Sequence, residues 1–270
     1  HHSTGAKFVD PVTELNKRAP AAPAAESGVS SDIEVIVDDN NPIHGVTGCD
    51  RYVARAIHGF DPTNHTPNWM RRRLIRAGMR SISLAVDVTN YVMLDLGQPM
   101  HAYDLDKIEG PIVVRRAAEG EKLTTLDGKE HDLSVEDLLI TDSPDGKRGS
   151  RILGIAGVMG GLYGEVTADT KNILLEAAHF DSVSIARSAR RHKIPSEASR
   201  RFERGVDTQL QPAAAQMAAE LLTKFGNGEP SEHPTDVNTT MYRRPIPFKA
   251  TEVARVAGLD VDVNRISDIL

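Results

Sequence analysis

Short segments with the residue pattern of β-strands recur between residues 33 and 175, and each is bounded by turn-forming residues. Ile33–Val37 and Arg51–Ile57 alternate apolar with polar side chains at a period of two, as half-buried strands do. Asp127-Gly128 is typical of a tight hairpin turn. A chain with this succession of short strands is expected to form several sheets. Further strand-like stretches lie at 112–115, 138–141, 151–158 and 172–175.

Helical patterns stand between some of these strands and dominate the later part of the chain. A helix is predicted at 67–77, with Thr66 as its N-cap and Gly78 at its end. Further helices are predicted at 182–191 and 212–225, and in the second of these apolar residues fall on one stripe. The fold class that follows is α+β: a mixed, multi-sheet module with packed helices, followed by a truncated domain that contains helix.

Composition divides the chain into four parts. Residues 1–31 are expected to be a purification-tag remnant, His1–Gly5, and a linker rich in Ala, Pro, Ser and Gly, which cannot supply a core. The folded module is expected at 32–228, followed by a polar linker at 229–240. Residues 241–270 carry a short helical segment and stop within a second apolar pattern, so we expect them to be the start of an incomplete domain.

Charge and cysteine content limit the class of protein. Of the 270 residues 40% are hydrophobic, enough for a proper core. The net charge of -6 argues against a protein that coats nucleic acid, although arginines cluster locally at 71–80 and 187–204. A single cysteine, Cys49, and the lack of an apolar leader predict a reducing, cytoplasmic location. The longest uncharged run, 152–163, is too short for a membrane helix.

Four blocks carry the candidate functional residues. They are DVTNYVMLDLGQPMHAYDLD at Asp87–Asp106, GIAGVMGG at Gly154–Gly161, NILLEAA at Asn172–Ala178 and SEASRRFERGVD at Ser196–Asp207. The glycine block lacks the Gly-x-Gly-x-x-Gly spacing and a following Lys-Ser/Thr, which argues against ATP binding there. No multi-Cys or His-x-x-x-His pattern indicates zinc.

Residue chemistry alone leaves several interpretations open. His101 is a general base, a hydrogen-bond donor to a substrate, or a histidine satisfied inside the fold. Gly157 either permits close packing of strands or brings backbone N–H groups to a ligand carbonyl. Glu176 ends an aliphatic run, so it needs a partner: an internal arginine, the end of the following helix, or a ligand. Arginines of the last block are expected to pair mostly with Glu197, Glu203 and Asp207.

Together and in this order, the four blocks resemble the editing module of the bacterial phenylalanyl-tRNA synthetase beta subunit. The resemblance covers about residues 33–228, and the tail from Tyr242 is similar to the opening of the following domain. It implies that the chain is a piece of a longer subunit of the enzyme that attaches phenylalanine to tRNA(Phe). The implied activity is hydrolysis of mischarged tyrosyl-tRNA(Phe) by a positioned water.

The resemblance also assigns roles to residues. It places Thr89, Asn90 and His101 around the ester and the attacking water, and the backbone of Gly157 against the substrate. It implies that Glu176 accepts a hydrogen bond from the tyrosine hydroxyl. The rest of the pocket wall is assigned to Arg80, Ser196 and Ala198.

The sequence departs from the family pattern at four positions, none of which removes a pocket residue. Ser196 stands where Thr is usual, which deletes one methyl group and keeps the hydroxyl. Tyr103 replaces a usual Phe, Glu197 a usual Asp and His179 a usual aromatic residue.

Partners and cofactors follow from the same resemblance. Arg71 and Arg72 on the predicted helix are either phosphate contacts to tRNA(Phe) or a solvated face. The resemblance implies an alpha subunit as partner in a heterotetramer and places the use of ATP and magnesium outside this fragment. No cofactor, metal or membrane partner is expected here, and the fragment is expected to be a monomer.

Two functions of different kinds remain. The first is an editing hydrolase, and the second is a noncatalytic scaffold that docks the alpha subunit or tRNA, in which the same motifs only maintain the fold. They differ in the role of Glu176. A general RNA-binding module is less favoured, because one Trp, six Phe and five Tyr are too few for a dense stacking platform.

Overall fold

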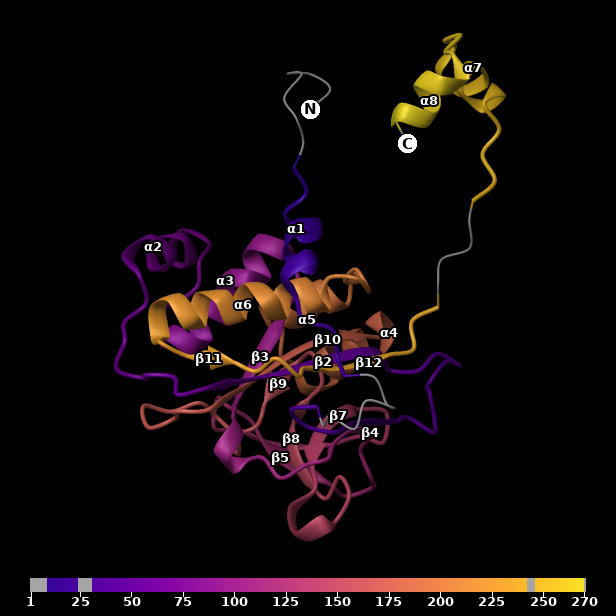
Figure 1. The fold of residues 1–270 in the computed structure, drawn as a ribbon. Coiled ribbons are helices and arrows are strands. Elements are labelled where there is room, and N and C mark those ends of the chain that lie inside the picture. The colour runs from indigo at the N-terminus through magenta and orange to yellow at the C-terminus, as the bar shows by residue number, and fades with distance from the viewer. Residues whose placement is uncertain (1–8, 24–30, 242–245, 270) are drawn as a thin grey trace. The chain divides into compact units, whose positions relative to one another are not determined.

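A computed structural model describes residues 9–23, 31–241 and 246–269 of the chain. The chain forms two compact units, His1–Thr239 and Thr240–Leu270. The first contains two five-stranded sheets, a small hairpin and most of the helices, as the α+β prediction requires. Figure 1 shows its arrangement as a ribbon.

The first sheet is built on the long central strand β2, Cys49–His58. Strand β10, Ile173–Phe180, pairs antiparallel with β2 on one side and with β3, Met100–Asp104, on its other side. The free edge of β2 pairs with two short antiparallel strands, β11 (Glu229–Pro230) and β12 (Thr235–Asn238). Residues 229–240 were expected to be a linker, but these strands hydrogen-bond to β2, which satisfies edge groups that a linker would leave open.

The second sheet has the strand order β1-β4-β7-β8-β9. Only the first pair, β1 with β4, is parallel. The predicted Asp127-Gly128 turn joins the separate hairpin of β5 and β6, where Gly128 has φ +79°. The bounds are β1 Val35–Asp38, β4 Ile112–Arg116, β5 Lys122–Thr124, β6 Glu130–Asp132, β7 Leu138–Asp142, β8 Arg151–Ile155 and β9 Met159–Gly160.

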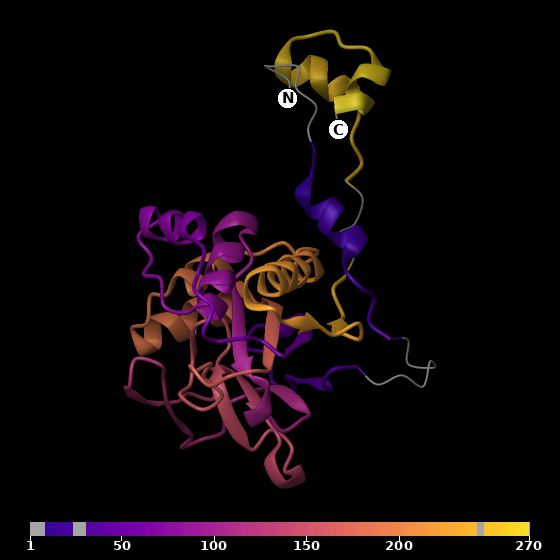
Figure 2. The ribbon, with the colours of Figure 1, turned by 60° about the vertical axis from the view of Figure 1, so that its left-hand side comes forward.

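Helices cover one face of the first sheet, and the second sheet covers the other. Helix α6, Gln211–Gly226, lies across β2 and β10, and α3, Leu84–Leu96, packs beside it. The turned view separates the helices above from the strands of the second sheet below (Figure 2). Buried alanines of α6 let this helix approach the sheet closely, because their side chains are small. They are Ala213, Ala214, Ala215, Ala218 and Ala219.

The alternation along β10 explains how the two sides of the first sheet are used. Leu174 and Ala178 belong to the core between the sheets, whereas Ile173 and Leu175 belong to the core under the helices. Glu176 falls on the same face as Leu174 and Ala178, because side chains of a strand alternate with period two. Its carboxylate therefore lies between the two sheets.

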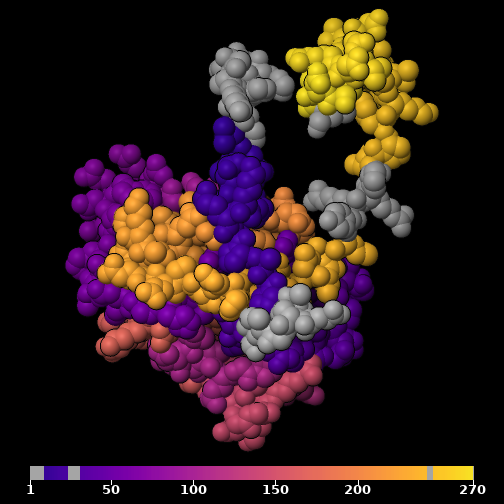
Figure 3. Space-filling model, in the orientation of Figure 1, coloured from indigo at the N-terminus to yellow at the C-terminus, as the bar shows by residue number. Residues whose placement is uncertain are grey.

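Two of the remaining helices, α1 and α5 (Glu197–Phe202), were not predicted from the sequence, and neither was α3. Helix α1, Pro11–Arg18, lies in the expected linker; its buried Leu15 packs on α6, and its Arg18 binds Glu220. Figure 3 shows α1 against α6 on the surface. Asp10 caps its first turn, so a local start signal was present in the sequence. The others are α2 Asn68–Arg76, α4 Ser182–His192 and α5 Glu197–Phe202, with short 3-10 turns η1 Leu105–Lys107 and η2 Pro144–Gly146.

The second unit contains α7, Thr251–Ala257, and α8, Val263–Ile269. Ile266 is its buried apolar residue, whereas most other apolar side chains described there are exposed.

Candidate active site

A cavity of about 310 Å³ lies between the two sheets. Its size is at the lower end of the range of ligand pockets, about 300 to 1,000 Å³. Strands β3 and β10, the β8–β9 hairpin, the end of α3 and the start of α5 form its walls. The lining residues are mostly apolar and include Met79, Met93, Met100, Met159, Leu126, Ile155 and Phe202.

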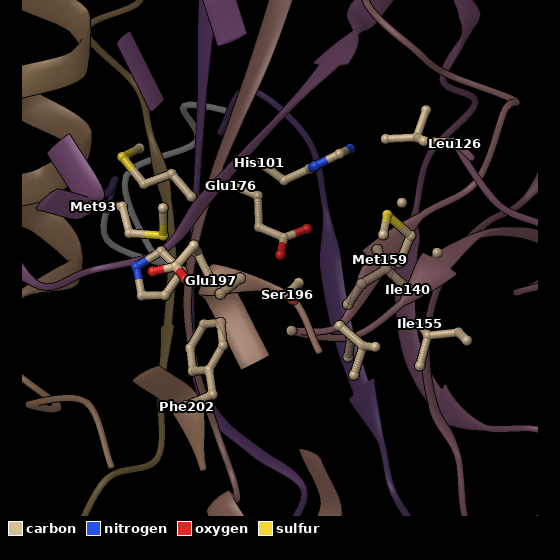
Figure 4. Close-up of a pocket in the computed structure, with 18 of the residues that line it drawn as sticks. Met93, His101, Leu126, Ile140, Ile155, Met159, Glu176, Ser196, Glu197 and Phe202 are labelled. Atoms are coloured by element: carbon tan, nitrogen blue, oxygen red, sulfur yellow. The ribbon is translucent and has the colours of Figure 1, made fainter. Parts of the chain in front are cut away.

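Glu176 places a carboxylate in this cavity. The side chain is 7% exposed, and its oxygen Oε2 accepts hydrogen bonds from the hydroxyls of Tyr52 at 2.9 Å and Tyr103 at 2.8 Å. No described residue donates to the other oxygen, Oε1. Figure 4 shows the carboxylate pointing into the space beside Ser196. Burial raises the pKa of Glu176 above its ordinary value, and the two phenol hydrogen bonds offset only part of this effect.

Neither structural partner expected for Glu176 is present. No described arginine pairs with this carboxylate, and Asp181, not Glu176, caps the helix that follows β10. The two tyrosines were not predicted as partners, because the sequence gives no sign of which strands lie on either side of β10. The carboxylate is thus bound by neutral donors only.

His101 lies directly opposite Glu176 in the register of β3 and β10, so both side chains project from the same face of the sheet. Burial lowers the pKa of His101 to about 4. The ring is therefore neutral at pH 7 and offers one N–H donor and one acceptor nitrogen. It packs edge-on against Tyr103 with 4.4 Å between ring centroids. No described residue hydrogen-bonds to this imidazole, which leaves both nitrogens available.

Gly157 lies in the turn between β8 and β9 with φ +65°. A Cβ atom there would meet Phe202 at 2.9 Å and Phe180 at 3.1 Å, so glycine is required by the turn and by the aromatic core behind it. The backbone of Gly157 lines the cavity. Its N–H has no hydrogen-bond partner among the described residues. The structure is therefore compatible both with a packing role for Gly157 and with a backbone N–H that is offered to a ligand.

Ser196 and Ala198 line the cavity at the start of α5. Ser196 is the N-cap: its Oγ accepts from the backbone N–H of Ser199, and the Ser199 hydroxyl completes a capping box. Glu197, between them, also lines the cavity and pairs with Arg200 and Arg201. The first turn of α5 thus has a structural role that would exist without any ligand.

The structure brings Asn90 to the cavity but not Thr89 or Arg80. Thr89 is buried on another face of α3, where its hydroxyl donates to the carbonyl of Val86 at 2.8 Å. Residues 89 and 90 are adjacent on a helix and project about 100° apart, so only one of them faces the cavity. Arg80 is exposed, and its neighbour Met79 lines the cavity instead.

Residues 48–227 match the B3/4 domain family, a range that contains every residue lining the cavity. The chain belongs to this family. It is 81% identical over 270 residues to the phenylalanine–tRNA ligase beta subunit of Bifidobacterium longum and 48% identical over 259 residues to that of Thermobifida fusca. These alignments cover 100% and 96% of this chain but 31% and 29% of the relatives. The chain therefore spans about a third of their length.

The Bifidobacterium longum alignment includes His1–Gly5, so these residues have a counterpart in a natural protein and the predicted tag loses its support. A solved N-terminal fragment of the phenylalanyl-tRNA synthetase beta subunit from Pyrococcus horikoshii has a TM-score of 0.42 and 14% identity to this chain. That match covers 94% of this chain and 67% of the fragment.

The two arginines predicted to contact tRNA lie outside the cavity of this B3/4 domain. Arg71 and Arg72 are exposed on α2, and no described carboxylate pairs with either. Arg71 borders a second hollow of about 580 Å³, next to the first turn of α3. Arg73, by contrast, stacks over Trp69 and donates to the Tyr91 hydroxyl at 2.7 Å, so it helps to hold α2 against α3.

The described residues contain neither a cluster of metal-ligating side chains nor a helix that could span a membrane. Among residues 9–23, 31–241 and 246–269, His, Cys, Asp and Glu side chains do not gather in groups of three or more that could hold a metal ion. Within the same ranges, every helix is too short or too polar to cross a membrane.

Proposed function

We propose that this B3/4 domain is the editing module of a phenylalanyl-tRNA synthetase beta subunit and that it hydrolyses tyrosyl-tRNA(Phe). The names of its relatives support the subunit, and the cavity supports the substrate. The observation that carries the proposal is the carboxylate of Glu176, which is buried in a largely apolar cavity and has one oxygen, Oε1, without a donor among the described residues.

Selection against tyrosine requires such a polar acceptor. A synthesis site shaped for phenylalanine is apolar, and an apolar pocket rejects an analogue with an added hydroxyl by only about a hundredfold. A second site that binds the hydroxyl reverses the preference, because phenylalanine would leave a buried acceptor unsatisfied. Oε1 of Glu176 is suited to accept from the phenol, while the methionine and leucine side chains around it pack against the ring.

The hydrolytic step needs no protein nucleophile. Water adds to the ester carbonyl, the bond from the carbonyl carbon to the ribose oxygen breaks, and the ribose oxygen takes a proton, which gives tyrosine and free tRNA. Asn90, His101 and Gly157 line the cavity. In this proposal Asn90 and His101 orient the ester and the water, and the free N–H of Gly157 donates to the developing oxyanion. With a pKa of about 4, His101 acts as a neutral hydrogen-bonding group and only as a weak base.

The remaining roles lie at a greater distance from the ester. We assign Arg71 and Arg72 to tRNA phosphates, and Arg80 to the terminal nucleotide outside the cavity. Thr89 supports α3 beside Asn90 and is not assigned a substrate contact. In the complete enzyme, the alpha subunit would supply aminoacylation with ATP and magnesium. This chain alone would therefore edit tRNA without charging it. We also propose that it is a monomer.

A noncatalytic scaffold is the second candidate, and specific observations favour it. The conformation of Gly157 and the capping role of Ser196 are both explained by the fold alone. Glu176 is not explained in this way, because a buried carboxylate without a cation destabilises a scaffold that makes no use of it.

The two functions are separated by measuring deacylation directly. Tyrosyl-tRNA(Phe) and phenylalanyl-tRNA(Phe) are incubated with the chain, with the complete synthetase and with buffer. Editing predicts that the synthetase hydrolyses the tyrosyl ester well above the buffer rate and spares the phenylalanyl ester. Rates equal to buffer for both esters would favour the scaffold, and equal rates above buffer would contradict recognition of the tyrosine hydroxyl.

A further inference from the structure

Three buried polar side chains from three adjacent strands meet at one point of the first sheet. Glu176 pairs with Ala54 on β2 and with His101 on β3. Tyr52 and Tyr103 are two residues away from these partners, so they are the diagonal neighbours of Glu176 on the same face. Tyr52 opposes a residue on one side of Glu176 along β10, and Tyr103 a residue on the other side. The carboxylate is therefore held from both directions.

Both hydroxyls donate to the same oxygen. The distances to Oε2 are 2.9 Å from Tyr52 and 2.8 Å from Tyr103, and the two tyrosines are 0% and 2% exposed. Buried hydroxyls held at these distances have little freedom to turn elsewhere. Because Oε2 takes both bonds, the orientation of the carboxylate is fixed and Oε1 is directed to the cavity.

We propose that Tyr52 and Tyr103 are positioning residues that bind Oε2 of Glu176 and so present Oε1 to the cavity as an anionic acceptor. This inference rests on the proposed function, since it concerns the site that would recognise a phenol. It assigns a role in specificity to two residues that act through Glu176; Tyr52 does not line the cavity, whereas Tyr103 also borders it. Tyr103 is of particular interest, because the sequence departs there from the Phe that is usual in the family it resembles.

Neutral donors are suited to this task. An arginine beside Glu176 would neutralise its charge and compete with a ligand for Oε1, whereas a phenol stabilises the anion through one O–H and leaves the charge in place. The other titratable groups near this point are Cys49 from β2, His101 from β3, Asp142 from β7 and Glu197 from α5. None of them donates a hydrogen bond to the carboxylate. A substrate phenol at Oε1 would repeat the interaction that the two tyrosines already make.

The test replaces each tyrosine by phenylalanine, which keeps the ring and removes the hydroxyl. Tyr52→Phe, Tyr103→Phe and the double variant are compared with Tyr91→Phe, whose hydroxyl binds Arg73 away from this site. Ionisation of Glu176 is followed by NMR of the chain with ¹³C-labelled glutamate carboxyls, and Glu176→Gln assigns the signal. We expect the midpoint to move to higher pH in each single variant and furthest in the double variant, because hydrogen bonds to the anion are lost. An unmoved midpoint in both single variants would overturn the inference.

Deacylation by the complete synthetase gives the second measurement. The double variant is expected to raise KM for tyrosyl-tRNA(Phe) on the order of tenfold, with a smaller change in kcat. As the pH is lowered, the variant should lose activity at a higher pH than the parent, because Glu176 is protonated sooner. Thermal melting of each variant identifies any that do not fold, and each single variant is an independent test. If the NMR midpoint moves but the parent enzyme shows no tyrosyl-specific deacylation, the proposed function fails while the positioning of Glu176 stands.

Discussion

Asp137 and Glu176 are both buried carboxylates of the first unit, and their surroundings differ in charge. Asp137 accepts hydrogen bonds from Ser188, from His192 and from the backbone N–H of Ser134, and it forms an ion pair with Arg191. Burial alone would raise the pKa of Asp137, but the hydrogen bonds from Ser188, Ser134 and His192 lower it below the ordinary value. Glu176 has only two phenols, and its pKa is raised.

The carboxylate of Asp137 holds the fold together, whereas that of Glu176 is available to a ligand. Asp137 joins the start of β7 to helix α4, and both of its oxygens are used. Glu176 has one oxygen free and lines a cavity. The arginines divide in the same way: Arg187 and Arg191 pair with Glu136, whereas Arg71 and Arg72 have no described partner.

The largest expected effect is on stability, from Asp137→Asn. Asn removes the charge of a fully buried carboxylate that binds Ser188, His192 and Arg191, and breaking such a buried network costs about 3 to 5 kcal/mol of unfolding free energy, although Arg191 keeps its second partner, Glu136. Denaturant unfolding measures the loss. Asp132→Asn is the control, since its side chain is 84% exposed and its loss should change stability by less than about 0.5 kcal/mol. Similar values for the two variants would remove the basis for calling Asp137 structural.

Gly157→Ala tests whether the packing of the fold by itself requires glycine at this position of the cavity wall. The added methyl group would lie about 3 Å from Phe202 and Phe180. Gly120→Ala is the matched control, because Gly120 also has a positive φ but has open space around it. The control should cost about 1 kcal/mol, and Gly157→Ala about 1 to 3 kcal/mol more. Equal losses in thermal or denaturant unfolding would show that the aromatic core does not require glycine here.

A smaller effect is expected when the unpaired arginines are neutralised. Arg71→Gln with Arg72→Gln should weaken tRNA(Phe) binding and reduce the slope of log K against log salt by up to about 0.9 for each phosphate that the protein no longer neutralises. Arg148→Gln with Arg187→Gln removes the same charge from arginines that are paired with Asp38 and Glu136. If both double variants keep the parent slope in binding titrations, Arg71 and Arg72 belong to a solvated helix face.

Much of the fold could be predicted because its signals are local. Alternation marks β2, and the start and stop residues of α4 and α6 lie within a few positions of the observed ends. Thr66 shows the limit of such signals: it was predicted to cap α2, but its hydroxyl donates to Asp87 instead. A side chain that has both a local and a distant partner cannot be assigned from sequence, because the competition depends on tertiary packing.

The site was predictable in part for the same reason. Asn90, His101, Gly157, Glu176, Ser196 and Ala198 lie in blocks with a distinct sequence pattern, and the structure brings them to one cavity. Tyr52 lies outside those blocks in an ordinary strand, so only the pairing of β2 with β10 identifies it. The placement of Thr89 and Arg80 depends on the rotation of α3 and on the turn before it, which no local pattern fixes.

If the free oxygen of Glu176 recognises a phenol, Glu176→Gln should remove most of that recognition. Gln keeps the volume and an acceptor but loses the charge, which weakens a hydrogen bond from a phenol by on the order of 1 kcal/mol or more. In the complete synthetase we therefore expect deacylation of tyrosyl-tRNA(Phe) to fall about tenfold or more, while phenylalanine charging and the thermal melt stay at parent values. Parent-rate deacylation by a variant with an unchanged melt would contradict this recognition and make Glu176 a structural residue.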